Sequence, residues 1–185
     1  MALWLVLVAP GVVVPVAADF ISPYALTDFT LTNSTFADGF AITPDGGHSI
    51  VLTGPNDGSG LPGYTELTVT SKGVGPFRFH YAYSSADAPG ADRAGYLING
   101  QFHVVASADG QSGSISAPIH LGDRIGFRVE SDDNIGEPGV LTITDFSAGP
   151  ALVPAASPGS LILTATLLAL SSALFMRRRD GSARG

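Results

Sequence analysis

The sequence predicts an all-β protein: an antiparallel β-sandwich, jelly-roll-like or immunoglobulin-like, flanked by an N-terminal signal peptide and a single C-terminal transmembrane helix. Three observations lead to this prediction. Between residues 28 and 146, apolar and polar side chains alternate with the period of two that strands show. The 23 glycines and 13 prolines suit many short strands joined by turns. Both ends of the chain are apolar runs.

Two segments alternate most clearly. Residues 77–83 place four aromatic rings on one face, and residues 124–130 place Ile125, Phe127 and Val129 on one face. Four rings on one strand need burial, so we expect them to lie in the core; stacking on sugar rings at an exposed face is the alternative. The four aromatic residues are Phe77, Phe79, Tyr81 and Tyr83.

The other expected strands cover residues 65–70, 114–119 and 141–146, together with a hairpin over residues 96–105. Asn99 and Gly100 supply the two positive-φ residues that a type I′ hairpin turn requires. No stretch in the body has helical periodicity over ten residues. We therefore expect eight or nine strands in one domain, residues 19–149.

The N-terminal run is predicted to be a signal peptide, residues 1–18. It is apolar, it is interrupted by helix breakers, and it ends in the small residues Ala17 and Ala18 before Asp19. Cleavage is expected after Ala18. The alternative is a first buried strand of the domain.

The C-terminal segment has three parts. A linker with a sorting-motif remnant, residues 150–157, precedes an uncharged span over residues 158–176, and a basic cytoplasmic tail covers residues 177–185. Nineteen residues at ~1.5 Å each give a helix of roughly 28 Å, close to the ~30 Å hydrocarbon thickness of a bilayer. Three consecutive arginines after the span favour a cytoplasmic tail, with the body outside.

This tail resembles the C-terminal sorting signal of the PEP-CTERM family of exported bacterial proteins. Val153, Pro154 and Pro158 lie where the Pro-Glu-Pro motif is expected, without its Glu, and the basic end is Arg177, Arg178 and Arg179. The resemblance implies recognition by an exosortase-like processing enzyme and removal of the span; a plain membrane anchor is the alternative. The body, over residues 92–100, 110–113, 122–127 and 141–146, also looks like a sandwich ectodomain that recurs in such proteins.

Charge and composition limit the function. From residue 19 to residue 154 there are 15 acidic and 5 basic residues, a net charge of −10. A body this acidic repels phosphate backbones, so we expect no nucleic-acid partner. The chain has no cysteine, which excludes disulfides, thiolate nucleophiles and Cys-zinc sites.

One acidic loop is a candidate metal site. Carboxylates, an asparagine amide and backbone carbonyls are the oxygen ligands that Ca²⁺ takes. Asp87 and Asp92 are candidates for a second contribution, and the alternative is a solvated acidic turn. The residues of the predicted calcium loop are Glu130, Asp132, Asp133, Asn134 and Glu137.

No catalytic motif is present: there is no Gly-x-Ser-x-Gly elbow and no His-Glu-x-x-His. We therefore expect a non-enzymatic, exported protein of the cell surface or extracellular matrix, with a structural or adhesive role and the membrane as a partner. The alternative is a Ca²⁺-assisted carbohydrate-binding module that contacts extracellular polysaccharide. A secreted hydrolase is a third hypothesis, from a different class.

Overall fold

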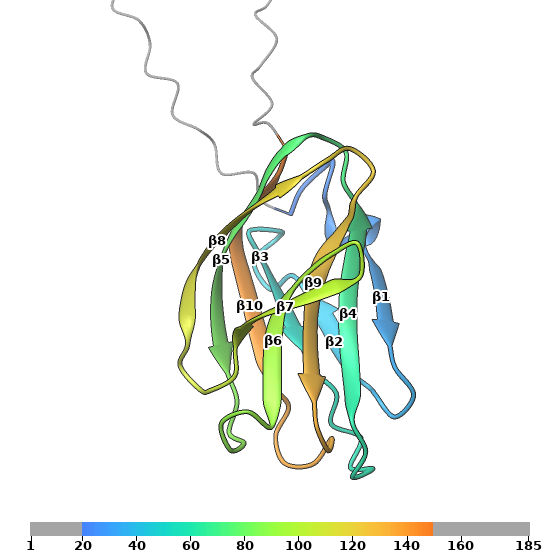
Figure 1. The fold of residues 1–185 in the computed structure, drawn as a ribbon, viewed down its shortest axis with the longest axis vertical. Helices are drawn as coiled ribbons and strands as arrows, with labels where there is room; N and C mark the ends of the chain where they lie inside the picture. Colours follow the sequence, from blue (N-terminus) through green and yellow to red (C-terminus); the bar gives the residue numbers. More distant parts are fainter. Residues whose placement is uncertain (1–19, 150–185) are drawn as a thin grey trace, which may run out of the picture. The chain divides into compact units, whose positions relative to one another are not determined.

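The computed structural model describes residues 20–149. This part of the chain forms ten strands and one short 3-10 helix, Leu26–Asp28 (Figure 1). The strands are β1 (Thr30–Asn33), β2 (Phe40–Ile42), β3 (Ser49–Thr53), β4 (Gly63–Thr70), β5 (Gly75–Ser84), β6 (Asp92–Ile98), β7 (Gln101–Ala106), β8 (Ser112–Ile119), β9 (Arg124–Ser131) and β10 (Val140–Ala148).

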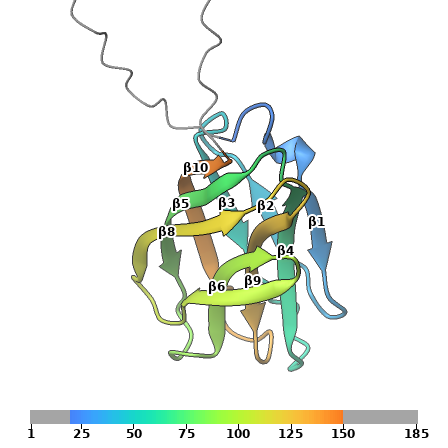
Figure 2. The same ribbon diagram turned by 45° about the horizontal axis from the view of Figure 1, so that its top comes forward.

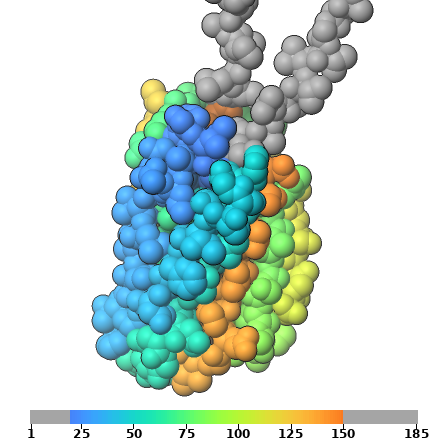
Figure 3. All heavy atoms as spheres, turned by 180° about the vertical axis from the view of Figure 1, so that it is seen from behind, coloured from blue at the N-terminus to red at the C-terminus, as the bar shows by residue number. Residues whose placement is uncertain are grey.

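The strands form two antiparallel five-stranded sheets that lie as layers (Figures 1 and 2). Sheet A has the order β1-β4-β9-β6-β7, and sheet B has the order β2-β3-β10-β5-β8. From behind, sheet B is seen in this order across the molecule (Figure 3). Without β1 and β2, the orders 4-9-6-7 and 3-10-5-8 are those of a jelly roll, two Greek keys folded on each other. The all-β sandwich prediction is confirmed, and the jelly-roll alternative is the one observed.

Apolar side chains from both sheets meet in the core between the layers. Phe77 and Phe79 on β5 and Phe127 on β9 are fully buried and pack with ring centroids 5.1–5.8 Å apart. Tyr83 is also buried, and the partly buried Tyr81 donates its hydroxyl to the Val105 carbonyl at 3.1 Å. The core placement expected for this aromatic strand is therefore confirmed.

The predicted turn and strands are largely present. Asn99 and Gly100 have φ values of 52° and 83°, as a type I′ hairpin between β6 and β7 requires. The strands expected at residues 65–70, 114–119 and 141–146 lie within β4, β8 and β10. The alternation did not single out β1 to β3, because β1 is exposed on both faces and β2 is only three residues long.

The predicted terminal segments lie outside the described residues. This applies to the signal peptide, the linker, the span at residues 158–176 and the basic tail, including Val153, Pro154, Pro158, Arg177, Arg178 and Arg179. Within residues 20–149, no helix is long and apolar enough to cross a membrane.

Five loops gather at one end of the sandwich, the lower end in Figure 1. They join β1 to β2, β3 to β4, β5 to β6, β7 to β8 and β9 to β10. Backbone hydrogen bonds tie them together: the Gly58 N–H donates to the Asn134 carbonyl at 2.8 Å, and the Asp132 N–H donates to the Ala91 carbonyl at 2.9 Å. This region, called the loop end below, carries most of the polar residues singled out from the sequence.

Candidate functional site

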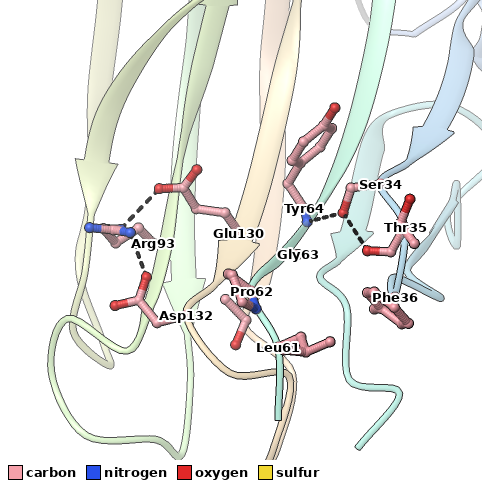
Figure 4. A pocket seen from close by; sticks show the side chains of 11 residues that line it. Ser34, Thr35, Phe36, Leu61, Pro62, Gly63, Tyr64, Arg93, Glu130 and Asp132 are labelled. Carbon is pink, nitrogen blue, oxygen red and sulfur yellow. Dashed lines mark hydrogen bonds and ion pairs between the residues drawn. The ribbon is translucent and has the colours of Figure 1, made fainter. Parts of the chain in front are cut away.

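A pocket of about 480 Å³ opens at the loop end (Figure 4). Its walls come from four places in the chain: the β1–β2 loop, the start of β4 with the residues before it, the start of β6, and the end of β9. Segments that are distant in the sequence therefore meet here because the jelly-roll order places β4, β9 and β6 side by side.

One wall of the pocket is charged. Arg93 on β6 faces Glu130 across the strand pair, with Nε to Oε1 at 3.0 Å, and its Nη2 donates to Asp132 Oδ1 at 2.6 Å (Figure 4). The Arg93 side chain is 38% exposed, while its Nε is buried. Its planar fork fixes both carboxylates, and their remaining oxygens can accept hydrogen bonds from a ligand.

The opposite wall carries an exposed aromatic ring, Phe36. Its side chain is 49% exposed and its φ is 63°, an uncommon conformation for a bulky residue. The Asn134 amide donates to the Phe36 carbonyl, and Asn134 is itself fully buried. A strained backbone persists only where its surroundings fix it, and this buried amide does so.

Tyr64, between these walls, is held by a stack on the outer face of sheet A. The Arg128 guanidinium lies 4.4 Å from the centre of the Tyr64 ring and 4.9 Å from that of Phe102. Arg128 also donates from Nε to Glu66 Oε1 at 2.8 Å. Cation–π contacts and the ion pair together restrict Tyr64, so this side of the pocket is preorganised.

The residues of the predicted calcium loop have separate environments. Glu130 and Asp132 contact Arg93 in the pocket wall, Asp133 accepts from the Ile135 N–H at 3.1 Å, and Glu137 is exposed. Asn134 is buried, and its N–H donates to the Ser131 hydroxyl. Within residues 20–149, no three His, Cys, Asp or Glu side chains gather as a metal group. Calcium binding by this loop stays a prediction.

A second hollow, of about 310 Å³, lies on the outer face of sheet B. There His80 Nδ1 lies 2.6 Å from Asp145 Oδ2. A register shift between Thr144 and Ser147 and a φ of 50° at Asp145 turn this carboxylate toward β5. No local sequence pattern indicated this pair, because its members are 65 positions apart. Both side chains are more than half exposed, so water screens their interaction.

The pocket at the loop end has the chemistry of a site for a hydroxyl-rich ligand. Its charged wall offers guanidinium donors and carboxylate acceptors, which together match sugar hydroxyls. The exposed Phe36 ring offers an apolar surface on which the C–H face of a sugar ring can stack. Phe36 was not recognised from the sequence, because its place beside the pocket depends on the fold, and the amide that bonds its carbonyl belongs to Asn134, 98 positions away.

In comparisons with known proteins, no family model and no curated protein matches this chain. Among solved structures, it is similar to the secreted serine protease VesC from Vibrio cholerae, with a TM-score of 0.40 and 14% identity over 56% of this chain and 22% of that one. It is also similar to a family 35 carbohydrate-binding module from Clostridium thermocellum, with a TM-score of 0.35 and 18% identity over 64% of this chain and 92% of that one. A third similar structure is TmCBM61 in complex with β-1,4-galactotriose, with a TM-score of 0.37 and 12% identity over 69% of this chain and 91% of that one. At these scores the similarity carries no functional argument.

Proposed function

We propose that this protein is an exported, cell-surface β-sandwich that binds polysaccharide through the pocket at the loop end, and that it acts by binding and not by catalysis. The observation that carries the proposal is the Phe36 ring, held half-exposed in a strained conformation opposite the Arg93 wall. The positive φ of Phe36 costs the folded protein some stability, and strained backbone conformations of this kind are typical of ligand-binding sites.

The charges favour a neutral polysaccharide. The wall has one guanidinium and two carboxylates, so it carries net negative charge. The body around it also has a net charge of −10, which repels uronates and sulfates at low ionic strength. A neutral sugar chain needs only donors, acceptors and an apolar platform, and all three are within the pocket.

The cell-surface location is proposed from the two ends of the sequence. The signal peptide, the apolar span and the basic tail with Arg177, Arg178 and Arg179 support export followed by anchoring or sorting. The intact mass of the protein recovered from its native cells tests this. A product that starts at Asp19 and ends near residues 153–158 supports processing at both ends. A membrane-bound chain that retains Arg177 to Gly185 supports a plain anchor.

Gel retardation on immobilised neutral polysaccharides tests the binding proposal. The full chain is expected to be retarded by at least one neutral polymer, and Phe36→Ala is expected to lose about tenfold in affinity, the loss of roughly 1.4 kcal/mol of stacking. Phe40→Ala is the matched control, because Phe40 on β2 is equally exposed, at 51%, and does not line the pocket.

Two outcomes would contradict the proposal. Equal affinity of Phe36→Ala and Phe40→Ala would mean that any sugar binds elsewhere. No retardation by any neutral polymer would favour a purely structural role for the sandwich, with the pocket a packing feature of the loops.

A further inference from the structure

The loop end holds a second polar cluster, on the inner side of β6. Asp92, the first residue of this strand, is 2% exposed and lies opposite Ser131 on β9. Its Oδ2 accepts from the Ser85 hydroxyl at 3.1 Å. Its Oδ1 is buried and accepts no hydrogen bond of good geometry among the described residues, although the Ser131 hydroxyl and the Gly139 N–H lie close enough to lower the pKa of the carboxyl. A buried carboxylate with an unpartnered oxygen is costly unless positive charge or a donor reaches it.

Two more oxygens of residues 83–92 are also buried without a hydrogen-bond partner of good geometry in the described part of the chain. Asp87 Oδ2 and the Tyr83 hydroxyl are both buried and without a hydrogen-bond partner among the described residues. Ser85 connects the two carboxylates: its hydroxyl accepts from the Asp87 N–H at 3.2 Å and donates to Asp92. Three oxygens without a hydrogen bond of good geometry, two of them from carboxylates, therefore belong to the end of β5, the β5–β6 loop and the start of β6.

No basic side chain compensates this charge in the described part of the chain. The nearest in sequence is Arg93, which points outward to Glu130 and Asp132. Burial raises the pKa of the Asp92 carboxyl, and the charge of Asp87 adds to this, while hydrogen bonds from Ser131 and Ser85 act in the opposite direction.

The pKa of the Tyr83 phenol is raised as well. Burial, followed by the negative charges of Asp92, Asp87 and Asp109, raises the pKa of its phenol to about 12. The Asp109 carboxylate lies at the rim, where it accepts from the Ser85 N–H at 3.2 Å. A hydrogen bond with the Ser85 side chain acts in the opposite direction on the Tyr83 pKa. The charged groups that shift the pKa values of Tyr83 and Asp92 are all carboxylates of the described residues, and their field favours a cation.

The neighbouring β9–β10 loop contacts this cluster through two glycines, Gly136 and Gly139. A methyl group at Gly136 would overlap the Asp87 carboxylate, and one at Gly139 would contact the Tyr83 hydroxyl and lie 3.2 Å from Asp92 Cβ. The backbone of one loop thus comes close to the carboxylates of another. Only residues without a side chain fit here.

We propose that Asp87 and Asp92, with neutral oxygens that include the Tyr83 hydroxyl, bind one Ca²⁺ ion. Ca²⁺ is a hard cation that takes carboxylates, neutral oxygens and water in a flexible arrangement, and its charge equals that of the two carboxylates. The ion would hold the β5–β6 and β9–β10 loops together behind the pocket. Asp87 and Asp92 are the two residues that the sequence suggested as second contributors to the acidic loop, whereas no residue of the predicted calcium loop itself is among these ligands. The inference does not depend on sugar binding.

Thermal melts of the full chain in EDTA and in Ca²⁺ test the proposal. The wild type is expected to gain about 8 °C or more at ~100 times the Kd, because ligand binding to the folded state alone stabilises it. Asp92→Asn should melt above the wild type in EDTA, because it removes an uncompensated buried charge, and should not respond to Ca²⁺. This reversal of the order of the two proteins is the expected signature.

Asp133→Asn is the matched control, because it removes one carboxylate from the exposed acidic loop and keeps the side-chain oxygen that accepts from Ile135. It should respond to Ca²⁺ like the wild type. A wild-type melting temperature that does not change in millimolar Ca²⁺, or a Ca²⁺ response that Asp133→Asn loses and Asp92→Asn keeps, would overturn the proposal.

Terbium luminescence supplies a readout independent of stability. Tb³⁺ replaces Ca²⁺ at oxygen sites, and excitation of a tyrosine next to the ion transfers to it. The full chain is expected to bind one Tb³⁺ that Ca²⁺ displaces, and Tyr83→Phe should remove most of the sensitised emission. Emission that is unchanged in both Tyr83→Phe and Asp87→Asn would place the ion elsewhere and contradict the assignment.

Discussion

Asp92 and Arg93 are neighbours on β6, and their side chains have opposite environments. Arg93 points outward, where two carboxylates contact its guanidinium and water reaches all three groups. Asp92 points inward, 2% exposed, with one oxygen unpartnered and another carboxylate as its charged neighbour. Paired charges at a surface stabilise a protein little, whereas a buried unpaired charge costs much more. One step along a strand therefore separates the pocket that we propose for a neutral ligand from the cluster that we propose for a cation.

The largest change in the free energy of unfolding is expected when one partner of a partly buried ion pair is replaced. Arg128→Met should lower the free energy of unfolding by about 3 kcal/mol, because Glu66, 9% exposed, would lose its hydrogen-bonded guanidinium and keep only the Arg124 guanidinium at 4.0 Å. Urea denaturation measures this.

The double variant Arg128→Met with Glu66→Gln sharpens this prediction, because it removes both charges. It should recover most of the loss. If the double variant is as unstable as the single one, the packing of Arg128 on Tyr64 and Phe102 stabilises the sheet, and the ion pair does not.

The unpaired carboxylate should behave in the opposite way. In EDTA at pH 7, Asp92→Asn is expected to raise the free energy of unfolding by about 1 kcal/mol. The raised pKa of Asp92 means that the folded wild type binds this proton more tightly than the unfolded chain, so its stability falls as pH rises through that pKa. The advantage of the variant should therefore disappear below the ordinary value of 3.8. Urea titrations across pH would contradict this if the difference stayed constant.

The exposed ion pairs of the pocket should affect binding more than stability. Arg93→Met is expected to weaken polysaccharide binding about tenfold and to change the free energy of unfolding by no more than about 0.5 kcal/mol. Gel retardation and urea denaturation of one preparation measure both. A large loss of stability with unchanged affinity would assign Arg93 a structural role.

The smallest effect is expected at the pair on sheet B. His80→Gln should change the free energy of unfolding by about 0.5 kcal/mol or less, because His80 and Asp145 are more than half exposed. Any effect should shrink in high salt. A loss above 2 kcal/mol would show that exposure is a poor guide to the value of charge pairs in this protein.

The sequence predicted the strands whose two faces differ. In β5 and β9, apolar and polar positions alternate because one face packs in the core, and the Asn99-Gly100 turn is a local requirement of the backbone. Strand order was not predictable, because it depends on which distant strands pair. The jelly roll became evident only from the pairing of β10 with β3 and β5.

The site was predicted less well than the fold, for a physical reason. The acidic loop was prominent because its carboxylates are consecutive, yet Glu130 and Asp132 contact Arg93 and Asp133 caps a turn. Whether a carboxylate is paired or unpaired depends on burial and on which face of a strand it occupies. Likewise, the backbone of Phe36 is held by a hydrogen bond from Asn134, 98 positions away, which no local pattern in the sequence indicates.

The most direct test of the account is a glycan array probed with the full chain and with Phe36→Ala and Phe40→Ala. Binding to neutral glycans that is reduced in Phe36→Ala and retained in Phe40→Ala is the predicted result. Binding confined to sulfated or uronate glycans, or equal binding by all three proteins, would contradict the assignment of the pocket as a site for neutral polysaccharide.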